Sequence, residues 1–158
     1  MILKADYEAK TVLEINYDKL KQEGIKVLAF DLDSTVMKSK SGTFSPETLA
    51  LFENLKKDFK LVIISNNSNL EYIEKAAKQI DFPVIAPAKK PRTAMSKKFL
   101  KEHNISEKEM AMIGDRPLTD ILFGKILGCK TILVDSISWQ EEKPIVRIAR
   151  KIERLVNI

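Results

Sequence analysis

Acidic side chains follow two hydrophobic runs of this 158-residue sequence. Asp31 and Asp33 come directly after one run, and Asp115 and Asp120 come shortly after another. Carboxylates that share one site repel each other, and their proton affinities rise unless a cation neutralises them. Mg²⁺ suits such a site, because it is commonly held by one or two carboxylates, waters and a substrate phosphate. The acidic residues therefore predict a magnesium site; the alternative is that they are ordinary solvated turn and loop residues.

Hydrogen-bond donors and positive charges follow two further hydrophobic runs. Ser65 and Asn66 come after one of them, and Lys89 and Lys90 come after the other. A hydroxyl group, an amide and an ammonium group suit the oxygens of a phosphate while charge redistributes during its transfer. These residues therefore predict a phosphate site beside the metal. Two simpler interpretations stay open: Ser65 and Asn66 could cap the helix that follows them, and the lysines could be surface charges.

Hydrophobic periodicity predicts strands and helices that alternate along the chain. The strands are expected at 25–30, 61–64, 83–86, 110–113 and 131–134, and the helices are expected up to Gly24, from Ser45 and Pro46 onward, and at 70–80, 93–103, 118–127 and 144–158. Such alternation predicts a Rossmann-like α/β fold, with a central parallel sheet and helices on both faces. Ligands bind at the carboxyl ends of the strands in such sheets. The four polar segments, each placed after a strand, should therefore converge on one crevice.

Length and composition limit the protein class. With 44% hydrophobic and 31% charged residues, the chain is expected to form a single domain over 1–158, with an N-terminal leader and helix at 1–24. One cysteine, Cys129, excludes an internal disulfide, and one histidine, His103, leaves no zinc-ligand cluster, so both are expected to be structural. The net charge of +5 favours anionic partners. No hydrophobic run reaches the roughly 20 residues of a membrane span and no signal peptide is evident, so a cytoplasmic location is expected.

Four of these segments, in the same order, resemble the motifs of the haloacid dehalogenase (HAD) phosphatases. The matching residues are Asp31-Leu32-Asp33-Ser34-Thr35, Ser65-Asn66, Lys90-Pro91 and Gly114-Asp115-Arg116-Pro117-Leu118-Thr119-Asp120. More narrowly, the sequence is similar to the YqeG-like subgroup through SNN at Ser65, AKKP at Ala88, GDRPLTD at Gly114 and TILV at Thr131. Two departures concern substrate detail: Ser34 stands where the subgroup usually has Asn, and no aromatic residue follows Val36.

The resemblance implies a HAD fold and covalent phosphate chemistry. Asp31 would attack phosphorus and form an aspartyl-phosphate. Asp33 would protonate the leaving oxygen and then deprotonate the water that hydrolyses the intermediate. The Asp31 side chain, the Asp33 backbone carbonyl and Asp115 would bind Mg²⁺, and Asp120 would support the metal site.

The resemblance also implies which residues bind the substrate phosphate. These are Thr35, Ser65 and Asn66, together with a catalytic lysine. Lys90 is favoured because it precedes a proline, as in the family motif, whereas Lys89 remains the alternative.

The C-terminal segment 144–158 is predicted to be a basic amphipathic helix. Its apolar residues recur at helical spacing, with Arg147, Arg150, Lys151 and Arg154 between them. One interpretation is peripheral docking on an anionic membrane surface, through apolar burial and charge attraction. The favoured interpretation is that the apolar side packs on the protein's own sheet while the basic side faces water.

The loops at the predicted site are too short for a cap domain. About ten residues separate Thr35 from the helix start at Ser45, and the third strand runs almost directly into Lys89. An uncovered cleft suits a large or membrane-borne phosphate ester. Because relatives of the YqeG-like subgroup include phosphatases that act on phosphatidylglycerophosphate, this lipid is the substrate hypothesis. The alternative substrates are a soluble phosphometabolite, a nucleotide or a phosphoprotein.

A non-enzymatic role, as a phospho-binding or nucleic-acid-binding module, is the remaining alternative. A receiver-like switch would carry its phosphate-accepting Asp after a middle strand, whereas Asp31 follows the first predicted strand. Nucleic acid is not expected as a partner, because aromatic residues are not interleaved with the basic ones in a recognised binding motif.

Overall fold

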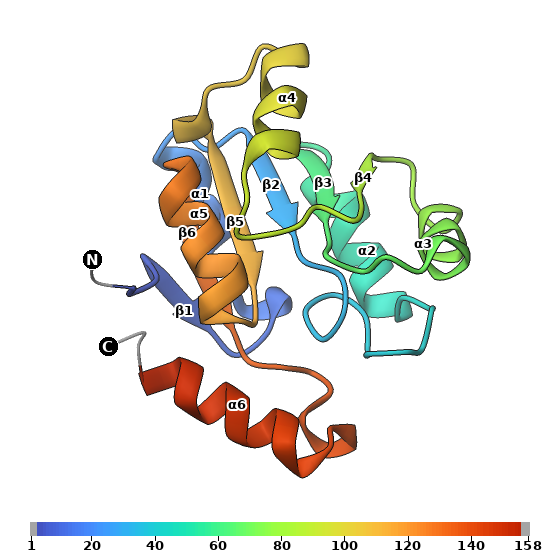
Figure 1. Cartoon of the computed structure of the whole chain (residues 1–158). Coiled ribbons are helices and arrows are strands. Elements are labelled where there is room, and N and C mark those ends of the chain that lie inside the picture. Colours follow the sequence, from blue (N-terminus) through green and yellow to red (C-terminus); the bar gives the residue numbers. More distant parts are fainter. Residues whose placement is uncertain (1–2, 156–158) are drawn as a thin grey trace.

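The strands of the protein form one six-stranded parallel sheet, in a computed structural model that describes residues 3–155 (Figure 1). They are β1 (Tyr7–Ala9), β2 (Val27–Phe30), β3 (Lys60–Ile64), β4 (Val84–Ile85), β5 (Met110–Gly114) and β6 (Lys130–Val134). Their order across the sheet is β1-β6-β5-β2-β3-β4, and every neighbouring pair is parallel. The chain moves from β2 to one edge through β3 and β4, and then to the other through β5 and β6. Ligands of open α/β sheets bind at such a switch point, here beside β2.

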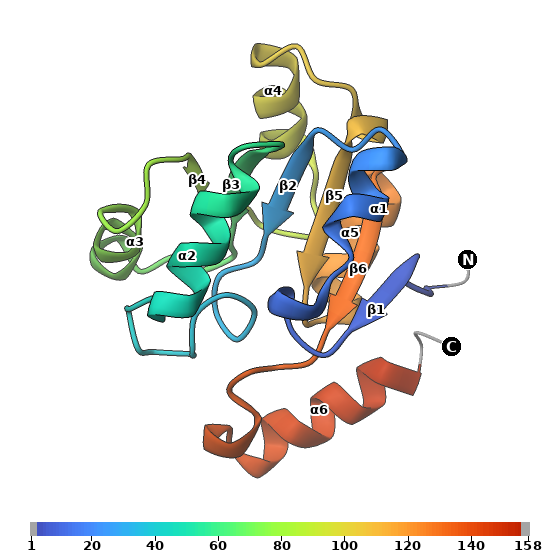
Figure 2. The same cartoon turned by 180° about the vertical axis from the view of Figure 1, so that it is seen from behind.

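Helices cover both faces of this sheet, as the sequence predicts (Figures 1 and 2). They are α1 (Tyr17–Gln22), α2 (Pro46–Leu55), α3 (Leu70–Ala77), α4 (Ala94–Glu102), α5 (Leu122–Leu127) and α6 (Pro144–Leu155). The side chains of α1 and α2 share one hydrophobic cluster with the sheet, and those of α4 and α5 share the other. The predicted Rossmann-like α/β fold is therefore confirmed.

The central strand β2 explains why the sequence shows a continuous hydrophobic run instead of alternation. Leu28 and Phe30 belong to the cluster under α1 and α2, whereas Val27 and Ala29 belong to the cluster under α4 and α5. All four side chains are buried, because both faces of the strand are covered. On the first face the Phe52 ring of α2 lies against three other phenylalanine rings, at centroid distances of 5.2 to 5.6 Å.

The sequence missed one strand and one helical irregularity. Strand β1 is only three residues long and reads YEA, so it shows no hydrophobic run. It pairs with β6 beside a contact in which Oδ2 of Asp6 accepts hydrogen bonds from the backbone nitrogen and hydroxyl of Thr131, at 2.8 and 2.9 Å. The helix expected at 118–127 begins as a π-helical turn, Pro117–Ile121, before α5. It ends at Gly128, whose positive φ of 90° suits glycine.

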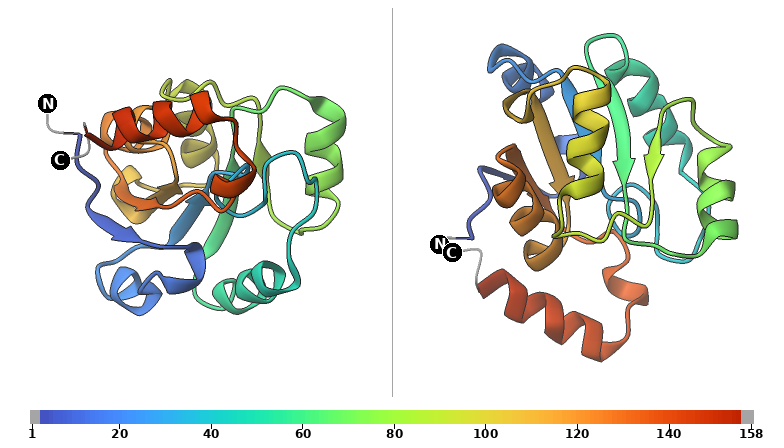
Figure 3. Two further views of the ribbon diagram at one scale, coloured as in Figure 1. Left: turned by 90° about the horizontal axis from the view of Figure 1, so that it is seen from below. Right: turned by 45° about the horizontal axis from the view of Figure 1, so that its top comes forward.

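The loops that follow β2 and β4 contain no inserted domain within the described residues, as expected for a chain without a cap. Figures 1 and 3 show that α6 instead crosses the edge of the sheet where the central strands end. Among residues 3–155, no helix combines the length and hydrophobicity needed to cross a membrane.

The favoured interpretation of the C-terminal helix is wrong, because α6 packs through its charged side. Four apolar side chains are 57% to 73% exposed; they are Ile145, Ile148, Ile152 and Leu155, and we call them the apolar seam. Arg150 and Glu153 are instead buried. The physical reason lies at the edge of the sheet, where charged partners from other segments meet these two side chains. The predicted helix extended to 158, and its residues 156–158 lie outside the described part of the chain.

Gly124 lies where α5 comes close to the sheet. A Cβ atom at this position would lie 2.3 Å from Cγ2 of Thr131, whose side chain is fully buried in β6. Because β-branched Thr131 has little freedom to turn aside, we predict that Gly124→Ala lowers the free energy of unfolding by about 1–3 kcal/mol. The higher helix propensity of alanine offsets only part of this loss.

Urea unfolding followed by circular dichroism measures the effect. Ile126→Ala is the matched control, because Ile126 is 51% exposed on the same helix. It should change the free energy of unfolding by less than about 1 kcal/mol. Equal midpoints for Gly124→Ala and the wild type would contradict the close approach of α5 and β6.

Candidate active site

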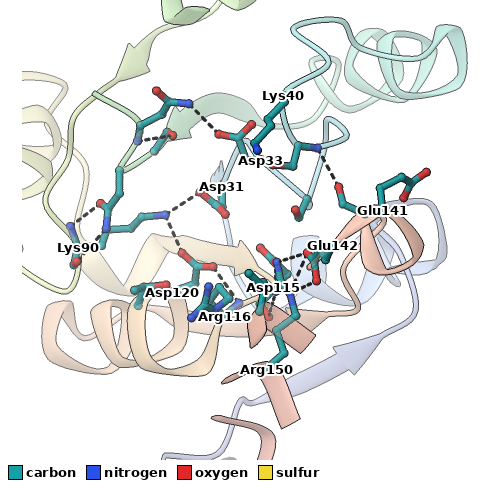
Figure 4. Close-up of a pocket in the computed structure, with 18 of the residues that line it drawn as sticks. Asp31, Asp33, Lys40, Lys90, Asp115, Arg116, Asp120, Glu141, Glu142 and Arg150 are labelled. Atoms are coloured by element: carbon teal, nitrogen blue, oxygen red, sulfur yellow. Dashed lines mark hydrogen bonds and ion pairs between the residues drawn. The ribbon is translucent and has the colours of Figure 1, made fainter. Parts of the chain in front are cut away.

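The predicted site residues meet in a pocket of about 680 Å³ at the carboxyl edge of the sheet (Figure 4). The segments after five strands, β2 to β6, supply its lining, and so does α6. The predicted residues that line it are Asp31, Asp33, Ser65, Asn66, Lys90, Asp115 and Asp120. The expectation that the polar segments after β2, β3, β4 and β5 converge on one crevice is therefore confirmed.

Three carboxylates form the base of the pocket. One oxygen from each of Asp31, Asp115 and Asp120 can be chosen so that all three lie within 4.8 Å of one another. This donor set fits Mg²⁺, which takes oxygen ligands. The side chain of Asp33 is not part of the cluster, so its predicted contribution to a metal site is that of its backbone carbonyl.

Lys90 places one positive charge against this cluster. Its Nζ donates to Oδ1 of Asp120 at 2.6 Å, to Oδ1 of Asp31 at 3.0 Å and to the carbonyl oxygen of Ile64 at 2.7 Å. The side chains of Lys90 and Asp120 are each 1% exposed. The neighbouring Lys89 is exposed and does not line the pocket, so the structure favours Lys90 of the two candidate lysines.

The proton affinities of these groups reflect an excess of negative charge. Burial would lower the pKa of Lys90, but the charges of Asp120 and Asp31 outweigh it and raise this pKa, so the lysine stays charged. Burial, followed by the charge of Asp120, raises the pKa of Asp31, and burial also raises the pKa of Asp120. Lys90 alone does not compensate the carboxylates, and a bound divalent cation would supply the missing charge.

Asp33 lies in a different environment from Asp31. The hydroxyl of Tyr72 donates to its Oδ1 at 2.6 Å, and Nδ2 of Asn67 donates to its Oδ2 at 3.0 Å. Burial, together with the hydrogen bond to Asp33, raises the pKa of Tyr72, so this hydroxyl keeps its proton. Two neutral donors therefore hold the Asp33 carboxylate at the pocket wall.

Asn66 fixes the backbone of Lys90. Its Nδ2 donates to the Lys90 carbonyl at 2.9 Å, and its Oδ1 accepts from the Lys90 nitrogen at 2.6 Å. Ser65 is buried, and its hydroxyl accepts from the Asn67 nitrogen at 3.1 Å. The N-cap of α3 is Asn69, so the alternative in which Ser65 and Asn66 cap this helix is wrong.

Thr35 occupies a different place from the one expected of a substrate-binding residue. It is 1% exposed and does not line the pocket. Its hydroxyl donates to Oδ1 of Asp115 at 2.8 Å. In this structure Thr35 therefore holds Asp115, one carboxylate of the acidic cluster, and does not face the pocket.

Gly114 explains how Asp120 reaches the cluster. A Cβ atom at Gly114 would lie 2.2 Å from Oδ2 of Asp120, so any other residue would displace this carboxylate. The π-helical turn brings Asp120 back against the end of β5, where the Arg116 nitrogen donates to Oδ2 at 3.1 Å. The missing side chain of Gly114 thus leaves the space that the carboxylate of Asp120, six residues later, occupies.

Sequence reasoning missed the residues that hold the site from outside the four motifs. Tyr72 lies within a predicted helix, and nothing in its spacing marks it. Asn67 follows Ser65 and Asn66 directly, and only its place in this SNN segment indicates a role at the site. The helical spacing predicts Arg150 on a solvated basic surface, yet it donates to the carboxylate of Asp115.

Solved structures share the fold of this chain. A predicted HAD-like family hydrolase from Porphyromonas gingivalis superposes with a TM-score of 0.56 at 13% sequence identity, over 82% of this chain and 98% of that one. At this identity the match shows the fold alone, and it agrees with the HAD fold that the motifs imply.

Two relatives are similar in sequence over nearly the whole chain. The probable phosphatase YqeG of Bacillus subtilis (strain 168) is 29% identical over 152 residues, which are 96% of this chain and 87% of YqeG. Phosphatidylglycerophosphate phosphatase 1, chloroplastic/mitochondrial, of Arabidopsis thaliana is 30% identical over 153 residues. This match covers 91% of the present chain but only 44% of the plant protein.

A family model agrees with these relatives. The model described as mitochondrial PGP phosphatase matches residues 2–138, which include β1 to β6 and each of the four motifs. The match ends before α6. The chain belongs to the mitochondrial PGP phosphatase family, a group of HAD-type phosphatases.

Proposed function

We propose that this phosphatase hydrolyses a phosphate monoester with Mg²⁺, through an aspartyl-phosphate on Asp31. The observation that carries the proposal is the cluster of Asp31, Asp115 and Asp120 against Lys90 at the switch point of the sheet. A nucleophilic carboxylate, a cation site and a buried ammonium group are the parts that transfer of a phosphoryl group to Asp31 requires. The bound magnesium ion would supply positive charge to the phosphoryl oxygens.

The first half of the proposed reaction transfers the phosphoryl group to the protein. A carboxylate oxygen of Asp31 forms a bond to phosphorus, and the bond between phosphorus and the leaving oxygen breaks. Asp33, in its protonated form, donates a proton to that oxygen. Lys90 neutralises charge beside Asp31, and Ser65 and Asn66, which line the same pocket, would contact the phosphate oxygens.

The second half returns Asp31 to its starting state. The Asp33 carboxylate takes a proton from a water molecule, and the oxygen of this water bonds to phosphorus. The bond between phosphorus and Asp31 breaks, which releases inorganic phosphate. Tyr72 and Asn67 keep Asp33 oriented through both halves by their hydrogen bonds to its two oxygens.

We propose phosphatidylglycerophosphate as the substrate. The printed names of the matching family and of the Arabidopsis relative support this choice. The pocket also supports it, because neither adjoining loop contains a cap that would enclose a small molecule. A soluble phosphometabolite, a nucleotide or a phosphoprotein remains the competing substrate class.

We also propose a peripheral location at an anionic membrane, reached from the cytoplasm. The apolar seam of α6 is exposed, and the basic residues Arg147 and Lys151 lie on the same helix. Helices of this kind bind lipid surfaces by burying apolar side chains while basic groups meet anionic headgroups. Lys143, directly before α6, and Val146, in its first turn, line the pocket, so a docked helix would hold the pocket near the lipid headgroups.

The chemistry is tested with Asp31→Asn. We expect its turnover of p-nitrophenyl phosphate to fall about a thousandfold or more, because amide nitrogen and oxygen replace the nucleophilic carboxylate. EDTA should abolish the activity of the wild type, and added Mg²⁺ should restore it. The melting temperature of Asp31→Asn should not fall, because Lys90 keeps its bonds to Asp120 and the Ile64 carbonyl.

Asp18→Asn is the matched control for this experiment, because Asp18 is an exposed carboxylate on α1. It should keep wild-type turnover. Activity that survives both EDTA and Asp31→Asn would overturn the proposed mechanism.

The substrate is tested by comparing phosphate release from different esters. The assay contains Mg²⁺ and detergent. We expect kcat/KM for phosphatidylglycerophosphate to be at least about tenfold higher than for glycerol 3-phosphate, a mononucleotide or a phosphopeptide. This ratio corresponds to about 1.4 kcal/mol in transition-state binding. Rapid hydrolysis of a soluble ester, with the lipid left intact, would sink the lipid hypothesis and leave the phosphatase chemistry standing.

The membrane contact is tested by sedimentation with phosphatidylglycerol vesicles. Because the apolar seam would lose buried surface, the double variant Ile148→Ser, Ile152→Ser should bind at least about tenfold more weakly than the wild type. Leu70→Ser is the control, since Leu70 is 67% exposed but lies on α3. Equal sedimentation of the double variant and the wild type would refute docking through the apolar seam.

A further inference from the structure

Helix α6 is attached to the protein by buried charges. Arg150 is 7% exposed and Glu153 is 5% exposed, whereas the apolar seam faces away. Burying a charged side chain is unfavourable unless a partner compensates it. The contacts of these two residues therefore determine where α6 lies.

Arg150 bridges two carboxylates with one guanidinium group (Figure 4). Its Nη1 donates to Oδ2 of Asp115. Its Nε and Nη2 meet the two oxygens of Glu142, at 2.8 and 2.7 Å. The side chains of all three residues are at most 8% exposed. A planar guanidinium group suits this arrangement, because it offers several donors in fixed directions.

A second ion pair holds the next turn of α6. Nη2 of Arg116 donates to Oε1 of Glu153 at 2.7 Å, and its Nε donates to Oε2 at 2.5 Å. Arg116 follows Asp115 directly in the chain. Both attachments of α6 therefore reach the segment that carries a predicted metal ligand.

The carboxylate of Asp115 is held from two sides. Thr35 donates to Oδ1 from the loop after β2, and Arg150 donates to Oδ2 from α6. Each carboxylate oxygen has two lone pairs, so one hydrogen bond leaves capacity for a metal ion. Because a ligand oxygen of Asp115 must lie close to those of Asp31 and Asp120, its orientation decides whether the three oxygens converge.

We propose that Arg150 is a positioning residue for Asp115, so that α6 is part of the metal site. This inference rests on the proposed Mg²⁺-dependent function. Arg150 acts through Asp115, by fixing the carboxylate for the metal. The family match ends at residue 138, so this contribution comes from a segment beyond the matched range.

Mg²⁺ binding tests the proposal directly, through the rise in melting temperature as Mg²⁺ is added. Arg150→Gln should raise the half-saturating Mg²⁺ concentration about tenfold to a hundredfold, the usual effect of losing a group that orients a metal ligand. Arg150→Lys keeps the charge but loses the planar guanidinium group that contacts Asp115 and Glu142 together. Its half-saturating Mg²⁺ concentration should therefore lie between those of Arg150→Gln and the wild type. Lys151→Gln removes the same charge from an exposed neighbour and should bind Mg²⁺ like the wild type.

Activity and fluorescence measurements test whether the change in Mg²⁺ binding arises at Asp115. With p-nitrophenyl phosphate, saturating Mg²⁺ should restore most of the kcat of Arg150→Gln, because the nucleophile and the lysine are intact. Trp139 is the single tryptophan of the chain, and the Arg147 guanidinium of α6 lies 5.6 Å from its ring centroid. Unchanged Trp139 emission in Arg150→Gln and Arg150→Lys would show that α6 stays in place.

Three results would overturn the inference, and they differ from a failure of the proposed function. Wild-type Mg²⁺ affinity in Arg150→Gln would show that Asp115 needs no second donor. Tighter Mg²⁺ binding in this variant would show that Arg150 competes with the metal. A kcat that stays low at saturating Mg²⁺ would place the action of Arg150 elsewhere in the reaction. If the wild type itself shows no response to Mg²⁺, the metal dependence fails, and this inference fails with it.

Discussion

The arrangement of the site depends on a shortage of positive charge among buried carboxylates. Asp31, Asp115 and Asp120 lie together, and the buried Lys90 contacts two of them. Interactions between charges strengthen inside a protein, so the surrounding segments must supply compensation. Asn66 fixes the backbone that carries Lys90, and α6 delivers a guanidinium group to Asp115. Several long-range contacts of the chain thus serve one electrostatic requirement.

The carboxylates of Asp31 and Asp33, separated by one residue in the chain, lie in different surroundings. Asp31 faces an ammonium group and two other carboxylates, whereas Asp33 faces the neutral donors of Tyr72 and Asn67. Different environments allow chemically identical groups to take different roles. An ammonium group beside a predicted cation site suits the proposed nucleophile, and neutral hydrogen-bond donors to both oxygens suit a group that must both give and take a proton.

The sequence predicted the parts of the fold that depend on burial. Strands such as β2 and β5 are covered on both faces, so their apolar runs are unmistakable, and the residues after them lie at the site as expected. Strand β1 has no such run, because it is a three-residue strand at the edge of the sheet and its side chains are not fully buried. The orientation of α6 could not be predicted for a related reason. Helical periodicity separates the apolar side of a helix from its charged side, but it does not say which side packs against the protein. For α6 this depends on Asp115, which lies 35 residues before Arg150 in the chain and binds its guanidinium group.

The two sides of α6 connect the proposals for chemistry and location. Its charged side reaches Asp115, and its apolar seam points away from the protein. An α-helix with its side chains is only about 10 Å across. If the apolar seam rests on a lipid surface, the carboxylate that Arg150 orients lies about one helix diameter from the headgroups. A phosphate ester that remains anchored in the bilayer can then reach the pocket without leaving the membrane, which a cap domain over the same opening would prevent.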